Sequence, residues 1–247
     1  MSSLPPLSLY IHVPWCVRKC PYCDFNSHTS PQSLPEKAYV AALIDDLQAD
    51  LAWVQDRAIS SVFIGGGTPS LFSGQTYQGL FQQLANYLNF ATDCEITLEA
   101  NPATVEHDNF EGYLAAGINR LSLGVQSFNP QHLQILGRIH SQQDAFNAIR
   151  LAKAAGFNNF NIDLMHGLPQ QNLAQALEDI DCALSFNPNH LSWYQLTIEP
   201  NTAFYRQPPA LPDDDILWAI QEAGQQKLAQ AGFQQYEVSA YSQQRPS

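Results

Sequence analysis

The feature that most limits the fold of this chain is a regular alternation of strand-like apolar runs with amphipathic stretches. Parallel strands need a crossover of a dozen residues or more between them, and an amphipathic stretch of that length follows each run. The pattern therefore predicts an α/β protein with a mainly parallel sheet. Six or seven repeats favour a barrel or partial barrel over an open sheet, although pattern alone does not separate the two. The predicted strands are 7–13, 61–65, 95–99, 120–126, 159–165 and 191–198, with 234–241 as a seventh possibility.

The amphipathic stretches between these runs are predicted to be helices. Three of them end in a glycine, at Gly117, Gly156 and Gly232, which suits the left-handed conformation that often closes a helix. The predicted helices are 35–55, 75–89, 107–116, 142–155, 173–185 and 213–231.

Composition narrows the functional classes. The chain has 247 residues, of which 45% are hydrophobic and 14% charged, as in a folded globular protein. Its formal net charge of −12 argues against nucleic-acid binding, which needs a basic face, and against a polybasic attraction to anionic lipid. No apolar run approaches the ~20 residues that span a bilayer, so no transmembrane segment is predicted. The first residues lack a basic segment and a long apolar core, and five cysteines do not suggest a disulfide framework. We therefore expect a cytoplasmic location.

Three cysteines form a compact C-x3-C-x2-C motif directly after the first predicted strand: Cys16, Cys20 and Cys23. Thiolates hold iron–sulfur clusters, and three thiolates on a four-iron cluster leave one iron open to a small molecule. The pattern therefore predicts a reaction centre on this loop.

Two other interpretations of the motif stay open. Zinc would need a fourth ligand, which His12 or His28 could supply, but zinc modules usually carry two separate knuckle pairs. The other alternative is a redox or structural thiol cluster. The single compact triplet favours the iron–sulfur interpretation. Cys94 and Cys182 each stand alone beside an apolar segment and are expected to be small buried side chains.

Polar residues gather at the ends of the later predicted strands. Acidic and amide groups in buried strands are costly unless they are paired, so several of them at one rim indicate a site for a polar ligand. A run of glycines after the second strand lets such a ligand approach the backbone, although alone it would be only a tight turn. Arg138 could bind a carboxylate, or it could be a solvated loop residue. The rim residues are Gly66, Gly67, Thr68, Glu99, Gln126, Asp163 and Thr197.

Taken together, these motifs resemble the radical S-adenosylmethionine (SAM) superfamily. Four segments are similar to the oxygen-independent coproporphyrinogen III oxidase family: Tyr-Ile-His-Val-Pro at 10–14, Gly-Gly-Gly-Thr-Pro at 65–69, Gly-Val-Gln-Ser-Phe at 124–128, and Asp-Leu-Met-His-Gly-Leu-Pro at 163–169. The resemblance covers essentially the whole chain. It implies a partial (β/α)6-type TIM-like barrel over residues 1–232 with a cluster loop at 14–26. Residues 233–247 would begin a C-terminal domain that is otherwise missing from this chain.

The resemblance also implies a role for each matched residue. Cys16, Cys20 and Cys23 would hold a [4Fe-4S] cluster whose open iron chelates the amino and carboxylate groups of S-adenosylmethionine. An electron donor would reduce the cluster, and cleavage of the sulfonium would give a 5′-deoxyadenosyl radical. The implied cofactor-binding residues are Tyr10, Tyr22, Gly66, Gly67, Thr68, Glu99, Gln126, Arg138, Asp163 and Thr197.

One position separates the branches of this family. The oxidases resemble C-x3-C-x2-C-x-C, whereas this chain has Phe25 at the fourth cysteine position. This departure resembles the HemW-type heme chaperone branch, which implies heme binding and heme transfer to an unidentified acceptor protein. The alternatives are oxidative decarboxylation of coproporphyrinogen III in porphyrin biosynthesis, and a truncated, catalytically idle iron–sulfur domain. Family members continue into a H-N-x-x-Y-W-like stretch, which nothing after Tyr241 matches, so we expect heme binding to be impaired in this fragment.

Overall fold

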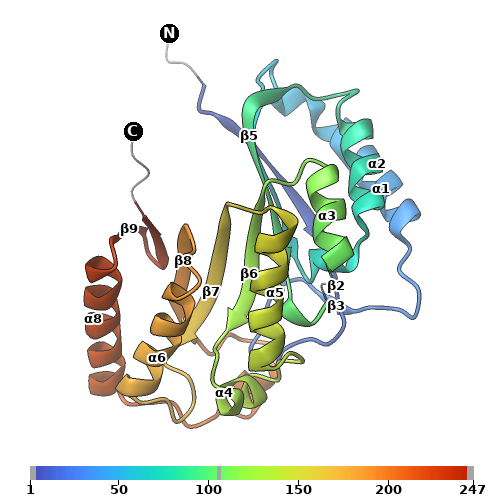
Figure 1. Ribbon diagram of the computed structural model, residues 1–247. Coiled ribbons are helices and arrows are strands. Elements are labelled where there is room, and N and C mark those ends of the chain that lie inside the picture. Colours follow the sequence, from blue (N-terminus) through green and yellow to red (C-terminus); the bar gives the residue numbers. More distant parts are fainter. Residues whose placement is uncertain (1–3, 105–106, 244–247) are drawn as a thin grey trace.

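The computed structural model describes residues 4–104 and 107–243, and their main element is a curved eight-stranded sheet (Figure 1). Its strand order is β1-β4-β5-β6-β7-β8-β10-β9. Neighbouring strands from β1 to β8 are parallel, whereas β10 is antiparallel to both β8 and β9. The strands are β1 (Leu7–Val13), β4 (Ile59–Gly66), β5 (Phe90–Ala100), β6 (Arg120–Gln126), β7 (Phe160–His166), β8 (His190–Gln195), β9 (Phe233–Glu237) and β10 (Ala240–Gln243).

The parallel strands follow one another in chain order, as expected for a β/α barrel. β1 and β9 are the two edges of the sheet and do not pair with each other, so the barrel is incomplete. The prediction of an α/β partial barrel is therefore confirmed, and the alternative of a closed barrel is excluded.

The long helices cover the outer face of this curved sheet, as Figure 1 shows. Capping boxes at Ser141 and Asn172 fix the starts of α5 and α6, and Gly156 closes α5 with a φ of 106°. The long helices are α1 (Glu36–Asp50), α2 (Gly74–Leu84), α3 (His107–Ala115), α5 (Gln142–Ala155), α6 (Leu173–Leu184) and α8 (Asp214–Gln230).

The alternation of side chains along each strand separates an apolar core from a polar interior. On β6, Leu121 and Leu123 are fully buried beneath the helices, whereas Arg120 and Ser122 face the inside of the barrel and line a cavity. Successive side chains of a strand point to opposite faces, so one sequence serves both layers. Cys94 is buried in the core as predicted, whereas Cys182 is only half-buried and packs against the core from outside.

The structure differs from the predicted elements mainly at short segments and at the last strand. Segment 234–241 is two antiparallel strands, because the chain reverses at Val238 and Ser239 between β9 and β10. β5 begins five residues before its predicted start, and β8 ends at Gln195. The elements not predicted are β2 (Trp15–Cys16), β3 (His28–Thr29), α4 (Pro130–Ile135), α7 (Ala203–Arg206), and the 3-10 turns η1 (Leu51–Trp53), η2 (Pro69–Leu71) and η3 (Pro102–Thr104).

Two further predictions concern the ends of the chain and membranes. β9 and β10 extend the same sheet as the barrel strands, and residues 244–247 lie outside the described residues, so the boundary at 232/233 stays a prediction. Within the described ranges, no helix combines the length and the apolar character that crossing a bilayer would need.

Candidate functional site

A cavity of about 880 Å³ lies inside the curved sheet and reaches the carboxyl ends of its strands. Parallel α/β proteins place their binding sites at that end. All the predicted site residues except Tyr10 line this one cavity: Cys16, Cys20, Tyr22, Cys23, Gly66, Gly67, Thr68, Glu99, Gln126, Arg138, Asp163 and Thr197.

Tyr10 lies beside the cavity rather than in its wall. It stands on the edge strand β1 and is 57% exposed. Its hydroxyl lies 3.0 Å from His12 Nδ1, and its ring stacks on Phe63, which does line the cavity. The other ring nitrogen of His12 lies 2.8 Å from the Asn26 carbonyl oxygen. Because partners already occupy both nitrogens, this histidine does not present a free nitrogen to the three thiols.

The cluster loop is fixed to the glycine turn by backbone contacts. Gly67 N donates to the Val13 carbonyl, and Thr68 N donates to the Trp15 carbonyl, both at 2.7 Å. A Cβ on Gly67 would lie 2.6 Å from the Trp15 oxygen, closer than a carbon can approach. Glycine is therefore required here because the loop and the turn pass so close together. The small β2–β3 pair closes the far side of the loop.

The three thiols of the loop are free, half-buried and directed toward the same cavity. Cys23 N donates to the Cys20 carbonyl in a turn, and burial raises the pKa of the Cys23 thiol. Among residues 4–104 and 107–243, no three histidine, cysteine or acidic side chains are already gathered around one point as metal ligands. The thiols thus share one loop and one cavity.

Arg138 provides positive charge next to the thiols. Its Nη2 donates to the Gly124 carbonyl at 2.6 Å and its Nη1 lies 3.5 Å from Cys20 Sγ. Its buried Nε has no hydrogen-bond partner among the described residues. An iron–sulfur cluster with its thiolates is negatively charged, so a buried guanidinium donating toward a thiolate suits it. The donor set and this cation fit a cluster on Cys16, Cys20 and Cys23.

Two carboxyl groups lie on the opposite wall. Gly66 N donates to Glu99 Oε2 at 3.2 Å, and Ser122 Oγ donates to Asp163 Oδ2 at 3.0 Å. Burial and the Asp163 charge raise the pKa of Glu99 to about 7, and burial also raises the pKa of Asp163. Two neighbouring acids in a buried wall suit a ligand that brings a positive charge or hydroxyl donors.

Gln126 ends β6 in an uncommon backbone conformation. Its φ is 70°, in the left-handed region, and the pairing of β6 with β7 shifts register between Leu123 and Gln126. Its side-chain Oε1 accepts a 2.6 Å hydrogen bond from the Tyr194 hydroxyl. Such strain in a non-glycine residue is typical of functional sites, where it re-aims a side chain.

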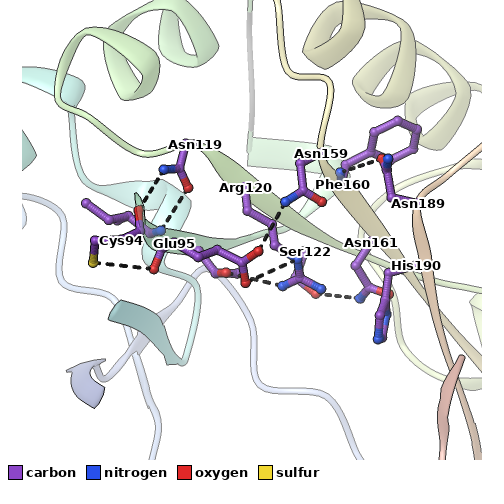
Figure 2. A network of polar contacts seen from close by, with 12 residues as sticks. Cys94, Glu95, Asn119, Arg120, Ser122, Asn159, Phe160, Asn161, Asn189 and His190 are labelled. Carbon is purple, nitrogen blue, oxygen red and sulfur yellow. Dashed lines mark hydrogen bonds and ion pairs between the residues drawn. The ribbon is translucent and has the colours of Figure 1, made fainter. Parts of the chain in front are cut away.

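The cavity wall also contains polar residues that the predicted site did not include. Figure 2 shows several of them in one network, in which Asn161 lies between Ser122 and His190. The signal was present as polar residues at alternate positions of otherwise buried strands. The additional polar wall residues on the strands include Glu95, Arg120, Ser122, Asn161, His190, Ser192, Tyr194 and Tyr236.

Comparison with known protein families gives a match over most of the chain. Residues 10–183 match the model of the Radical SAM superfamily. The heme chaperone HemW of Haemophilus influenzae is 56% identical over 246 residues, and that of Escherichia coli is 57% identical over 242 residues. Each match covers 98% of this chain and 64% of the relative, so the chain spans about two-thirds of the length of these proteins.

A more distant relative and a solved structure agree with this match. The mitochondrial radical S-adenosyl methionine domain-containing protein 1 of Bos taurus is 37% identical over 240 residues, which cover 95% of this chain and 54% of the relative. The structure of coproporphyrinogen III oxidase (HemN) from Escherichia coli, a radical SAM enzyme, superposes with a TM-score of 0.86 at 29% identity. That superposition covers 96% of this chain and 56% of HemN. The chain therefore belongs to the radical SAM superfamily and, within it, to the HemN-like HemW branch.

Proposed function

We propose that this protein is a heme chaperone that binds a [4Fe-4S] cluster, S-adenosylmethionine and heme, and that it transfers heme to an acceptor protein. The observation that carries the proposal is the single cavity shared by the three thiols, the glycine turn, the two carboxyls and Arg138. The identity of 56–57% to heme chaperones supports the branch. A cytoplasmic acceptor and a separate electron donor complete the proposal.

The cavity residues divide the work of binding between two walls. Cys16, Cys20 and Cys23 would hold the cluster, and Arg138 would offset its charge. When bound, a reduced cluster supplies one electron to the sulfonium ligand. The backbone of Gly66 and Gly67 permits close approach of the methionine part, because a side chain there would collide with His12 or Trp15.

The carboxyl wall would hold the other end of the same ligand. Glu99 and Asp163 face the cavity, where they can accept hydrogen bonds from an ammonium group or a ribose hydroxyl. Gln126 is oriented by Tyr194 and offers an amide donor. Together the two walls match a ligand with a zwitterionic end and a sugar end.

Phe25 argues for the chaperone over the oxidase. It lines the cavity, is 60% exposed, and occupies the position where the oxidase motif has its fourth cysteine. An exposed phenyl ring cannot ligate iron. It offers an apolar surface to a bound group instead.

Two assays on anaerobically reconstituted protein test the proposal. Heme is titrated into this chain and, in parallel, into the full-length Escherichia coli relative, and the Soret absorption is followed. We expect a saturable shift with the full-length protein, transfer of its heme to apomyoglobin, and weaker binding by this chain. Formation of protoporphyrinogen from coproporphyrinogen III would favour the oxidase instead, and the absence of a saturable shift with either protein would refute the chaperone function.

A further inference from the structure

A chain of hydrogen bonds connects the C-terminal hairpin to the carboxylate of Asp163. Tyr236 OH on β9 lies 2.7 Å from His190 Nε2, and His190 Nδ1 lies 2.7 Å from Asn161 Oδ1. Asn161 Nδ2 then donates to Asp163 Oδ1 at 2.6 Å and to Ser122 Oγ at 2.7 Å. Figure 2 shows the middle of this chain, where Asn161 and His190 project toward each other from neighbouring strands.

The donor of each hydrogen bond in this series follows from the Asp163 end, where Asp163 Oδ1 accepts from Asn161 Nδ2. Asn161 must present its amide nitrogen to the carboxylate, because its oxygen at 2.6 Å would be repelled. Its oxygen therefore faces His190, whose Nδ1 has to carry the proton. Burial and the nearby Arg120 lower the pKa of His190 to about 4, so the ring is neutral at pH 7 and its Nε2 is an acceptor. The Tyr236 hydroxyl must then donate to that nitrogen.

The series of hydrogen bonds ends at the Asp163 carboxylate, which keeps one acceptor position that no described residue fills. Asp163 accepts hydrogen bonds from Asn161, Ser122 and Ser192, and a carboxylate offers about four acceptor positions. The charged or titratable groups that face it are Glu99 on β5, Arg120 on β6 and Tyr194 on β8. Asn161 is 1% exposed, so its amide depends on these protein partners for its hydrogen bonds.

The other end of the chain lies on a peripheral element. Tyr236 is 66% exposed, and in the described part of the chain β9 pairs with β10 alone, at the edge of the sheet. The hydroxyl reaches His190 only while this hairpin stays against β8. A movement of the hairpin would therefore break the hydrogen bond to His190 and, through His190, change the contacts of Asn161 in the cavity.

We infer that Tyr236, His190 and Asn161 are positioning residues that orient Asp163 for its ligand, so that the C-terminal hairpin controls ligand affinity in the cavity. The inference rests on the proposed function in one respect, the use of S-adenosylmethionine as the ligand that Asp163 binds. The donor and acceptor order of the hydrogen bonds from Tyr236 to Asp163 does not depend on any ligand.

The first experiment uses ligand-free protein. Long-range ¹H–¹⁵N spectra of the histidine side chains report which ring nitrogen carries the proton. We expect His190 to be protonated at Nδ1 and neutral at pH 7, and the ¹³C signal of the Asp163 carboxyl to shift in Tyr236→Phe but not in Tyr205→Phe, another exposed tyrosine. A proton on Nε2 in the wild-type protein would overturn the inference.

The second experiment measures S-adenosylmethionine affinity of the anaerobically reconstituted protein at pH 6 and pH 8. His190→Leu removes the donor to Asn161 and should weaken binding about tenfold, whereas His190→Gln keeps a donor and should stay within about threefold. The loss should be larger at pH 6, because Asp163 without its oriented donor is protonated more easily. Equal losses in both variants, or a loss independent of pH, would contradict a positioning role.

The two experiments separate the two proposals. If the wild-type protein does not bind S-adenosylmethionine but His190 and Asp163 respond as described, the proposed function is wrong and the hydrogen-bond series is supported. If it binds S-adenosylmethionine and Tyr236→Phe leaves both the Asp163 signal and the affinity unchanged, the inference about the hydrogen-bond series is wrong and the proposed function is supported.

Discussion

The two walls of the cavity are organised in different ways. The cluster loop carries three half-buried thiols, and backbone hydrogen bonds hold this loop against the glycine turn. The strand wall, in contrast, carries side chains such as Asp163 and Asn161 that already bind one another at 2.6–3.0 Å. The loop is thus held by its backbone and leaves its thiols free to bind, whereas the side chains of the strand wall already hold one another. Variants of the loop should therefore change the content of the bound cluster. Variants of the strand wall should instead change the affinity for S-adenosylmethionine.

The largest effect is expected when one thiol of the cluster loop is removed. Cys20→Ala should abolish the brown absorption near ~400 nm and reduce iron and sulfide content to background, because two thiolates cannot hold the cluster. Cys94→Ala is the matched control, since Cys94 is buried in the core away from the cavity. Full iron content in Cys20→Ala would show that the loop is not the metal site.

The next effect is the pH dependence that the buried Glu99 gives to the free energy of unfolding. Glu99 has its pKa raised to about 7, so the folded protein binds its proton more tightly than the unfolded chain does. The stability that this group contributes is complete below pH ~4.5 and is lost as the pH rises through ~7. Glu99→Gln should therefore stabilise the protein at pH 8 relative to pH 5, by up to about 3 kcal/mol.

Urea unfolding at both pH values measures this difference. Burial lowers the pKa of four described histidines, His132, His140, His166 and His190, and these groups make the protein less stable as the pH falls. They are present in both proteins, so their effects cancel in the comparison. Glu222→Gln, at an exposed position on α8, is the control. A pH-independent effect of Glu99→Gln would mean that Glu99 does not hold its proton in the folded state.

A smaller effect is expected where the two walls meet. Gly67→Ala places a Cβ 2.6 Å from the Trp15 oxygen, so the cluster loop must move away from the turn. We expect a loss of about 2 kcal/mol in the free energy of unfolding. Gly79→Ala provides the contrast, because nothing lies within 4 Å of its new Cβ on α2 and alanine favours a helix. Equal stabilities of the two variants would remove the steric argument.

The smallest effect should come from neutralising a single carboxylate of the strand wall. Asp163→Asn keeps the shape of the side chain and removes its charge, and should weaken S-adenosylmethionine binding about tenfold, or about 1.4 kcal/mol, with full cluster content. Asp93→Asn, on the exposed part of β5, should bind normally. Loss of the cluster in Asp163→Asn would erase the distinction between the two walls.

The sequence predicted the long elements and most of the site because both have strong local signals. Continuous apolar runs indicate buried parallel strands, and the cysteine spacing indicates the cluster loop. The β2–β3 pair and α7 were missed because elements of two to four residues have no periodicity. The hairpin was read as one strand because nothing in Val238 and Ser239 marks a turn strongly.

The missed site residues were of a different kind. His190 and Arg120 are contacted by residues far away in the chain, so their roles depend on the register of four strands. Histidine beside a strand is also common on surfaces, so its type alone says little. Asn161 and Tyr194 stood next to predicted elements, but only the pairing of β6, β7 and β8 brings them to Asp163 and Gln126.

The left-handed backbone of Gln126 has a practical consequence for laboratory evolution. Glycine tolerates a φ of 70° at lower cost than glutamine, so a selection for thermal resistance should enrich Gln126→Gly. The same replacement deletes the amide that Tyr194 orients, so a selection for ligand retention should discard it. Parallel libraries selected for these two traits should therefore diverge at this codon.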